Sequence, residues 1–237
     1  MVSNAMHVQH HMRGVRLGEN SFQKGDHELE DLARLTRRQA LGRVLASLPF
    51  LASVQRTFAV DSELRIWLEA KSMAGPVTSP VPGAQRTTFC AGRWDGNQLR
   101  AFPRTEWSDT GLTWAQLEKI TARSASADLE KCLVQYKRDK RAVIEYAVLT
   151  CERNLVSSAV LAPDFASQFN DTLGDAILLA VPNRRQAFVF PQLGPDLSRY
   201  SDFVLNAYRD STYPVSVEVF EPRQGQFRGV GVLERQR

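Results

Sequence analysis

Apolar and polar residues alternate through much of the chain after residue 86, and this alternation predicts paired strands. Residues 87–93 and 97–102 flank Asp95-Gly96. An Asp-Gly pair between two apolar segments is typical of a β-hairpin, because the tight turn requires positive φ. The same period-two pattern predicts a strand at 142–151. A continuous apolar run predicts a strand at 175–181 with a partner at 186–190, and a last hairpin is predicted from 215–220 and 226–233.

Other segments have the apolar spacing and the end residues of helices. Thr113 and Gln116 have the spacing of a capping box, in which each residue's side chain accepts the other's backbone N–H. Pro163 stands where a second helix would open, and Gly174 stands where its left-handed terminator belongs. The three predicted helices cover residues 113–124, 165–173 and 197–208.

Helices that interleave with antiparallel hairpins indicate an α+β fold, a mostly antiparallel sheet built from hairpins with three helices packed on it. Upstream, residues 60–73 predict a short helix or strand. Residues 75–83 hold three prolines and two glycines, which favours an extended linker. We therefore expect a leader at 1–59, a short element with a Pro-rich linker at 60–86, and one α+β domain at 87–237.

The predicted leader contains a pattern that resembles the twin-arginine export signal, Ser/Thr-Arg-Arg-x-hydrophobic-Leu. The matching residues are Thr36, Arg37, Arg38 and Leu41. The apolar run 44–54 that follows has the length of a signal-peptide core and is shorter than the roughly 20 residues that span a bilayer. A small-x-small pattern places the expected cleavage between Ala59 and Val60. These features predict a periplasmic or secreted protein with no integral membrane span.

A second interpretation of the same segment stays open. Arg43 interrupts the apolar run, and about 35 residues precede the arginine pair, which is long for the charged start of a signal peptide. Residues 28–47 carry leucines near helical spacing. They therefore also fit an amphipathic helix that a cytoplasmic protein would retain.

The excess of basic residues lies mostly in the N-terminal segment, residues 1–59. The formal net charge is +4, from 30 Lys/Arg and 26 Asp/Glu, and residues 1–59 hold eight of the former and five of the latter. Residues 60–237 thus carry 22 basic and 21 acidic residues, whereas a nucleic-acid binder concentrates cations to displace phosphate counterions. The basic run 137–141 is better explained as a solvated turn before a strand. We expect no nucleic-acid partner.

The positions of the histidines and cysteines exclude several kinds of catalytic and metal-binding site. All four histidines lie within the first 27 residues, which excludes Ser-His-Asp and Cys-His catalysis, and histidine-bearing metal sites, for the body alone. Cys90, Cys132 and Cys151 form no CxxC motif. In an oxidising compartment one pair would bridge, but the spacing does not indicate which, and buried free thiols are the alternative. We expect no metal and no cofactor.

Three stretches resemble the YtpQ-like proteins, a bacterial family with a domain of unknown function. They are Gly111 to Leu117, Gly174 to Asn183, and Tyr213 to Phe220 with Gly225 after it. The resemblance covers residues 95–235. It implies no catalytic residues, because none is established for the family, and it implies a cytosolic location, where members of the family are generally found.

Carboxylates and surface anchors supply the remaining candidates. A carboxylate-dependent hydrolase needs two acids close together, and the residues considered are Glu145, Asp164, Asp171 and Asp175. We assign no catalytic residue among them. Arg and Trp are common interface anchors, so a recognition surface is predicted from Asn183, Arg184, Arg185, Trp94 and Trp107. Burial in the core is the alternative for the two tryptophans.

The sequence thus favours an exported, non-enzymatic α+β module that binds a protein partner or a small ligand in the cell envelope. One alternative is a cytosolic YtpQ-like accessory protein that keeps an N-terminal amphipathic helix. The other is a carboxylate-dependent hydrolase.

Overall fold

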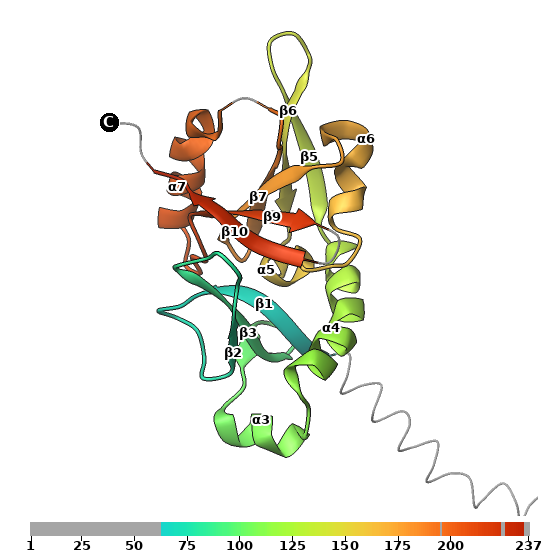
Figure 1. Ribbon diagram of the computed structural model, residues 1–237, viewed down its shortest axis with the longest axis vertical. Coiled ribbons are helices and arrows are strands. Elements are labelled where there is room, and N and C mark those ends of the chain that lie inside the picture. Colours follow the sequence, from blue (N-terminus) through green and yellow to red (C-terminus); the bar gives the residue numbers. More distant parts are fainter. Residues whose placement is uncertain (1–62, 195, 224–225, 235–237) are drawn as a thin grey trace, which may run out of the picture. The chain divides into compact units, whose positions relative to one another are not determined.

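Two antiparallel sheets form the frame of the domain (Figure 1). The computed structural model describes residues 63–194, 196–223 and 226–234, which all belong to one unit of the chain. Several predictions fall outside these residues: the export-signal residues Thr36, Arg37, Arg38 and Leu41, the cleavage pair Ala59 and Val60, and the alternative helix 28–47.

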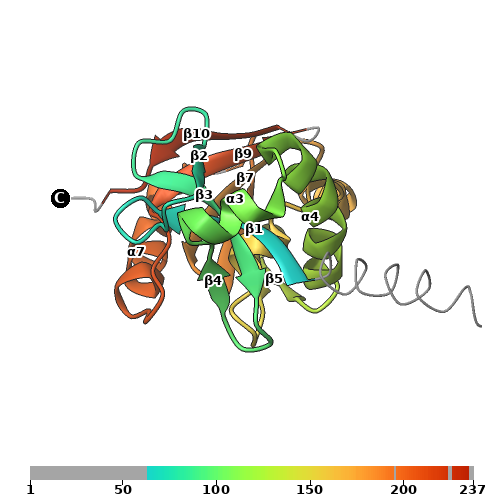
Figure 2. The same ribbon diagram turned by 90° about the horizontal axis from the view of Figure 1, so that it is seen from below.

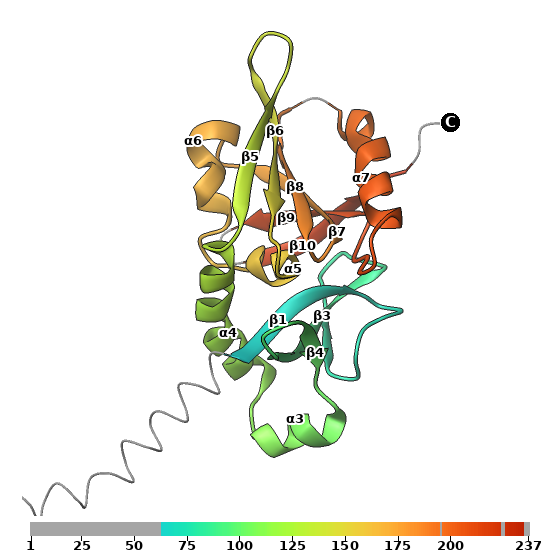
Figure 3. The same cartoon turned by 180° about the vertical axis from the view of Figure 1, so that it is seen from behind.

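The larger sheet has six strands in the order β10-β9-β7-β8-β6-β5 (Figure 3). They are β5 (Leu133–Arg138), β6 (Ile144–Thr150), β7 (Ile177–Asn183), β8 (Gln186–Pro191), β9 (Glu218–Arg223) and β10 (Gln226–Val232). The predicted β7–β8 and β9–β10 hairpins are confirmed. Strand β5 was not predicted, because five of its six residues are exposed and give no alternating apolar signal.

The smaller sheet is built around one long strand, β3. Its members are β1 (Leu64–Ala70), β2 (Thr78–Pro80), β3 (Thr87–Trp94) and β4 (Leu99–Ala101). β3 pairs with β1 along one edge and with β2 and β4 along the other. The predicted hairpin at Asp95-Gly96 is confirmed, and Gly96 has the positive φ of 93° that the turn requires.

Strand β1 corrects the predicted start of the domain at residue 87. All seven of its residues are buried, and its pairing with β3 makes it part of the same fold. The Pro-rich segment is packed as well, because Pro82 accepts a hydrogen bond of 2.8 Å from the N–H of Gly229 in β10. Gly83, at φ 74°, has no room for a Cβ, which would overlap the Gly229 carbonyl oxygen. Proline and glycine content predicted an extended segment but gave no sign of its packing.

Five α-helices occur among the described residues, where three were predicted, and the α+β class is confirmed. They are α3 (Arg104–Thr110), α4 (Trp114–Leu129), α5 (Val156–Ala159), α6 (Asn170–Leu173) and α7 (Ser201–Arg209). The 3₁₀ turns η1 (Ala166–Phe169) and η2 (Leu197–Tyr200) lead into α6 and α7. The two predicted helices there are therefore each a 3₁₀ turn joined to an α-helix. The unpredicted α3 and α5 are short and lack a side-chain cap.

Helix α4 begins at the predicted capping box and lies beside β1 (Figure 2). The Gln116 N–H donates to Thr113 Oγ1 at 3.3 Å, and the Thr113 N–H donates to Gln116 Oε1 at 2.8 Å. The helix continues past its predicted end at residue 124, because its last turns carry small and apolar residues that are buried, and α4 packs on β1 and α5. Packing thus outweighs the low helix propensity of serine and aspartate there.

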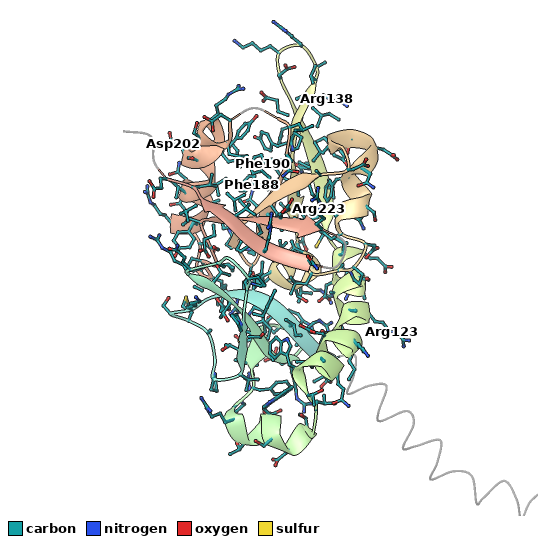
Figure 4. All side chains as sticks on the ribbon, in the orientation of Figure 1. Arg123, Arg138, Phe188, Phe190, Asp202 and Arg223 are labelled. Carbon is teal, nitrogen blue, oxygen red and sulfur yellow. The ribbon has the colours of Figure 1, made fainter. Side chains whose placement is uncertain are left out.

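Each face of the larger sheet carries its own core. Leu149, Leu179 and Val189 belong to the main cluster, which also contains residues of α4 and α5. The neighbouring residues Phe188 and Phe190 face the other way and pack beneath α7 (Figure 4). This alternation is expected of a sheet that is buried on both sides. On the α7 side five aromatic rings contact one another, with centroids 4.9 to 6.5 Å apart: Tyr146, Phe188, Phe190, Tyr200 and Phe203.

Candidate functional site

A cleft of about 1270 Å³ runs between helix α4 and the strands of the smaller sheet. We call it the α4 cleft. Half-buried Trp94 and buried Phe102 supply apolar surface to it. Its charged lining consists of Glu63, Arg65, Arg93, Asp95, Arg100, Glu106, Lys119, Arg123 and Lys131. Six of these nine side chains are basic, so the cleft is cationic although the domain is nearly neutral.

On the sheet side of the α4 cleft the cations are paired. Arg93 Nε lies 2.8 Å from Glu106 Oε1, and Arg100 Nε lies 3.2 Å from Asp95 Oδ2. The Gln98 and Asn97 backbone N–H groups donate to the Asp95 carboxylate, and they lower its pKa below the ordinary value. Asp95 is therefore available as the ion-pair partner of Arg100.

On the helix side Lys119 and Arg123 have no such partners. They are exposed, and within the described part of the chain neither makes an ion pair. Four residues apart on α4, they lie on the same face of the helix, one turn from each other. Figure 4 shows Arg123 extending from α4. These two cations give the α4 cleft its uncompensated charge.

A buried ion pair joins the base of the α4 cleft to the helix. Arg65 of β1 is 4% exposed and Asp128 of α4 is 0% exposed. Arg65 Nε and Nη2 donate to the two Asp128 oxygens at 2.7 and 3.2 Å, and Ser158 Oγ donates to Oδ2 at 3.2 Å. This two-pronged geometry is the strongest form of the Arg–carboxylate pair. It therefore joins α4 to β1 beside the cleft.

The predicted recognition residues Asn183 and Arg184 have structural partners in the β7–β8 turn. Asn183 is buried: its side chain donates to the Ala207 carbonyl at 2.9 Å and accepts from the Arg185 N–H at 2.9 Å. The Arg184 side chain is only 13% exposed and forms an ion pair with buried Glu69 of β1. Arg184 therefore joins the two sheets.

Two aromatic rings and an indole N–H complete this junction. The Arg184 guanidinium lies over the rings of Tyr213 and Trp67, at 5.3 and 5.9 Å from their centroids. The Trp67 N–H donates to Glu69 at 2.9 Å. Of the three predicted residues in this turn, only Arg185 is exposed.

The two tryptophans of the predicted surface lie apart from that turn. Trp94, at the end of β3, packs against the main core cluster and lines the α4 cleft. Trp107 of α3 packs on Phe102 with ring centroids 5.8 Å apart. The structure thus does not bring the five predicted residues together, although Trp94 joins a site that the sequence did not predict as a whole.

Of the four acids considered for hydrolysis, Glu145 lies in β6 and Asp171 in α6, whereas Asp164 and Asp175 lie in segments that join helices and strands. Asp164 accepts from Ser126 Oγ at 3.1 Å, and Glu145 lies 3.4 Å from Arg199. Asp171 and Asp175 are exposed. No hydrogen bond joins any two of these four described residues. Among the described residues no three His, Cys, Asp or Glu side chains gather closely enough to hold a metal ion.

Sequence reasoning missed the buried charges Arg65, Glu69 and Asp128. A signal for the first two was present, because both stand inside the apolar run 64–70. A charged side chain in a strand that is buried on both faces must have a partner. The position of that partner could not be predicted, because it depends on how α4 and the β7–β8 turn pack.

Compared with known protein families, with curated proteins and with solved structures, the chain matches none of them. The resemblance to the YtpQ-like family therefore stays a prediction. None of the described helices has both the length and the apolar character needed to cross a bilayer.

Proposed function

We propose that this protein is a non-enzymatic binding module, and that the α4 cleft receives an acidic segment of a protein partner. The observation that carries this proposal is that two exposed, unpaired cations, Lys119 and Arg123, line a cleft that is also lined by apolar side chains. Exposed cations that have no carboxylate of their own are available to one supplied by a partner.

The size of the α4 cleft favours a chain segment over a small molecule. Its volume of about 1270 Å³ exceeds the roughly 300–1,000 Å³ typical of small-molecule pockets. An acidic peptide would place carboxylates against Lys119 and Arg123 and apolar side chains against Trp94. Tryptophan and arginine are also the residues that most often anchor protein interfaces.

Two observations support binding rather than catalysis. Every histidine of the chain precedes residue 28, and no hydrogen bond joins any two of the four described acids considered for hydrolysis. A general acid–base pair needs its groups within hydrogen-bonding reach of one substrate atom. The α4 cleft instead holds its carboxylates in ion pairs with arginine.

The binding test uses a fluorescein-labelled oligoglutamate peptide and the full chain. We expect binding that weakens as salt is added, and a loss of about tenfold in affinity for the double variant Lys119→Ala/Arg123→Ala. The matched control is Lys140→Ala/Arg141→Ala, which removes the same charge from the exposed end of the β5–β6 hairpin (Figure 1). Equal losses in both variants, or tighter binding of single-stranded DNA than of the peptide, would reject the proposal.

We also propose that the module acts in the cell envelope after export through its twin-arginine-like leader. The double variant Arg37→Lys/Arg38→Lys should then accumulate in the cytoplasm, as measured by cell fractionation. A mature N-terminus near Val60 would support export. A protein that retains its N-terminal segment would support the alternative, a cytosolic accessory protein that keeps its amphipathic helix.

A further inference from the structure

Cys132 and Cys151 lie opposite each other at the end of the β5–β6 ladder. In this antiparallel pair Leu133 is the register partner of Thr150, and Val134 is the partner of Leu149. Extending the register by one residue beyond Leu133 and Thr150 places Cys132 opposite Cys151. Residues that face each other across antiparallel strands have Cβ atoms about 4.5–5.5 Å apart, and closer at non-hydrogen-bonded positions.

The hydrogen bonds of both backbones show that this is a non-hydrogen-bonded position. The Cys132 N–H donates to the Leu129 carbonyl at 3.0 Å, and the Cys151 N–H donates to the Arg185 carbonyl at 3.0 Å. Neither amide therefore donates to the other cysteine. At such positions the Cα atoms approach to about 4.5 Å, which lies within the 4.4–6.8 Å span of disulfides.

The side chains of Cys132 and Cys151 interact with each other. The Cys132 thiol lies within hydrogen-bonding reach of the Cys151 sulfur, and also 3.3 Å from the Asp128 carbonyl oxygen. The Cys151 sulfur also accepts from the backbone N–H groups of Arg153 and Leu155. The donated hydrogen bonds, that of Cys132 first, lower the pKa of Cys151 from 9.0 to about 6, against the opposing effect of its burial. Cys151 is therefore the thiolate of the pair and Cys132 the thiol.

A cavity gives Cys151 access to solvent. It has a volume of about 840 Å³, and Cys151 is part of its lining. Lys131, Arg153 and Arg185 line the cavity together with two acids, Glu152 and Asp210. A basic surrounding of this kind favours a thiolate and attracts an anionic thiol reagent such as glutathione. Cys132 itself is half-buried.

Cys90 has a different setting. It is 1% exposed in the middle of β3, and burial is the main cause that raises its pKa to about 11. It stays protonated and packed in the core, as a small apolar residue would be.

We propose that Cys132 and Cys151 form a reversible disulfide by exchange with a low-molecular-weight disulfide of the glutathione class. The Cys151 thiolate attacks one sulfur of oxidised glutathione, which forms a mixed disulfide and releases one glutathione thiolate. Cys132 then loses its proton to solvent and attacks the Cys151 sulfur, which releases the second glutathione thiolate. The two protein thiols are oxidised to one disulfide, and one oxidised glutathione is reduced to two thiols.

The bridge would tie the end of α4 to the end of β6. Asp128 and Lys131 lie just before Cys132, so the disulfide would hold the C-terminal end of the α4 cleft in place. The proposal does not depend on what the cleft binds, since it rests on strand register and on the cavity beside Cys151.

The test uses the full chain equilibrated with oxidised glutathione, quenched in acid, alkylated with iodoacetamide under denaturing conditions and mapped by mass spectrometry. We expect a Cys132–Cys151 disulfide in most molecules, with Cys90 alkylated. In Cys132→Ser, glutathione should stay attached to Cys151, because no thiol is present to displace it. In Cys90→Ser, formation of the disulfide should be unchanged.

Three outcomes would overturn the proposal. One is alkylation of all three cysteines after prolonged oxidation. Another is a disulfide that includes Cys90. The third is a glutathione adduct that persists on the unaltered chain, which would mean that the two cysteines do not approach closely enough to bridge. The unaltered chain decides each of these outcomes, so the folding of the variants does not affect them.

Discussion

Charged side chains in the interior of the domain are buried and partnered, whereas those on the helix side of the α4 cleft are exposed and unpaired. Asp128 holds Arg65, and Glu69 holds Arg184. Glu218 of β9, 2% exposed, accepts from the Gln85 N–H at 2.6 Å, the Arg86 N–H at 3.1 Å and the Thr87 hydroxyl at 2.6 Å. Lys119 and Arg123 have no counterpart of this kind.

The difference separates charges that hold the fold from charges that are available to a partner. A buried charge costs several kcal/mol unless it is paired and hydrogen-bonded, so the interior charges cannot be released for binding. An exposed cation has no such cost, and its removal leaves stability nearly unchanged. Stability and binding measurements should therefore separate the two groups.

The largest effect is expected from Asp128→Ala. This change leaves Arg65 buried without its carboxylate, and we expect a loss of about 3–5 kcal/mol in the free energy of unfolding. Urea titration followed by tryptophan fluorescence measures the loss. The double variant Arg65→Met/Asp128→Leu, which removes both charges, should recover most of it. A loss below about 1 kcal/mol for Asp128→Ala would show that the pair is not buried as described.

A smaller loss is expected from Glu218→Gln. The amide keeps the shape of the side chain but loses the charge, and its NH₂ group faces hydrogen-bond donors. We expect a loss of about 2 kcal/mol, since hydrogen bonds to a charged group contribute about 1.5–3 kcal/mol. Exposed Glu130→Gln is the control, with an expected change within about 0.5 kcal/mol. Equal effects of the two changes would contradict a structural role for Glu218.

The thiol pair is intermediate in exposure between the buried charges and the exposed cations, because Cys151 is buried and Cys132 is half-buried. Cys132→Ala removes the hydrogen bond that lowers the Cys151 pKa, at a cost of about 1 kcal/mol in stability. Only the thiolate reacts with iodoacetamide, so in the parent chain the alkylation rate at Cys151 should rise as the pH passes about 6. In Cys132→Ala the rise should move to higher pH. An unchanged pH profile would mean that Cys132 is not the donor.

The smallest effect on stability is expected from Lys119→Ala and Arg123→Ala. Each should change the free energy of unfolding by less than about 0.5 kcal/mol, while their combination weakens binding of the acidic peptide. Urea titration of the two variants, run beside the binding assay, checks both halves of this expectation. If either change destabilises the fold by more than about 1 kcal/mol, that residue has a structural partner and the contrast between the two regions is lost.

The sequence predicted the elements whose ends carry local chemistry. The capping box at Thr113 and the Asp-Gly turn at residue 95 each depend on a few adjacent residues, so their positions could be read directly. Strand β5 was missed because its residues are mostly exposed and show no alternation of apolar and polar positions. Helix α5 was missed because packing against distant segments, such as β1, determines it. The same holds for the ends of predicted elements: α4 extends to Leu129 because of what it packs against.

The candidate site was harder to predict than the fold. Trp94 was chosen as an exposed anchor and does line the α4 cleft, but Arg184 was chosen for the same reason and is held by Glu69. Sequence alone does not distinguish an arginine on the surface from one in a buried ion pair, because Glu69, the partner of Arg184, is distant along the chain. The cleft itself is formed by β1, β3, β4 and α4, and these elements span residues 64–129, so no local pattern could indicate it.

The crossing of Gly83 and Gly229 restricts how this domain can diverge. Because each residue would meet the main chain of the other segment, no shrinking of a neighbouring side chain can compensate for a methyl group added at either position. A larger residue at one position therefore cannot be compensated by a smaller residue at the other. Distant homologues should retain glycine at both positions even where the surrounding prolines are lost. Two glycines about 146 residues apart, one before β3 and one inside the last strand, would then mark the fold in sequences too different to align by other means.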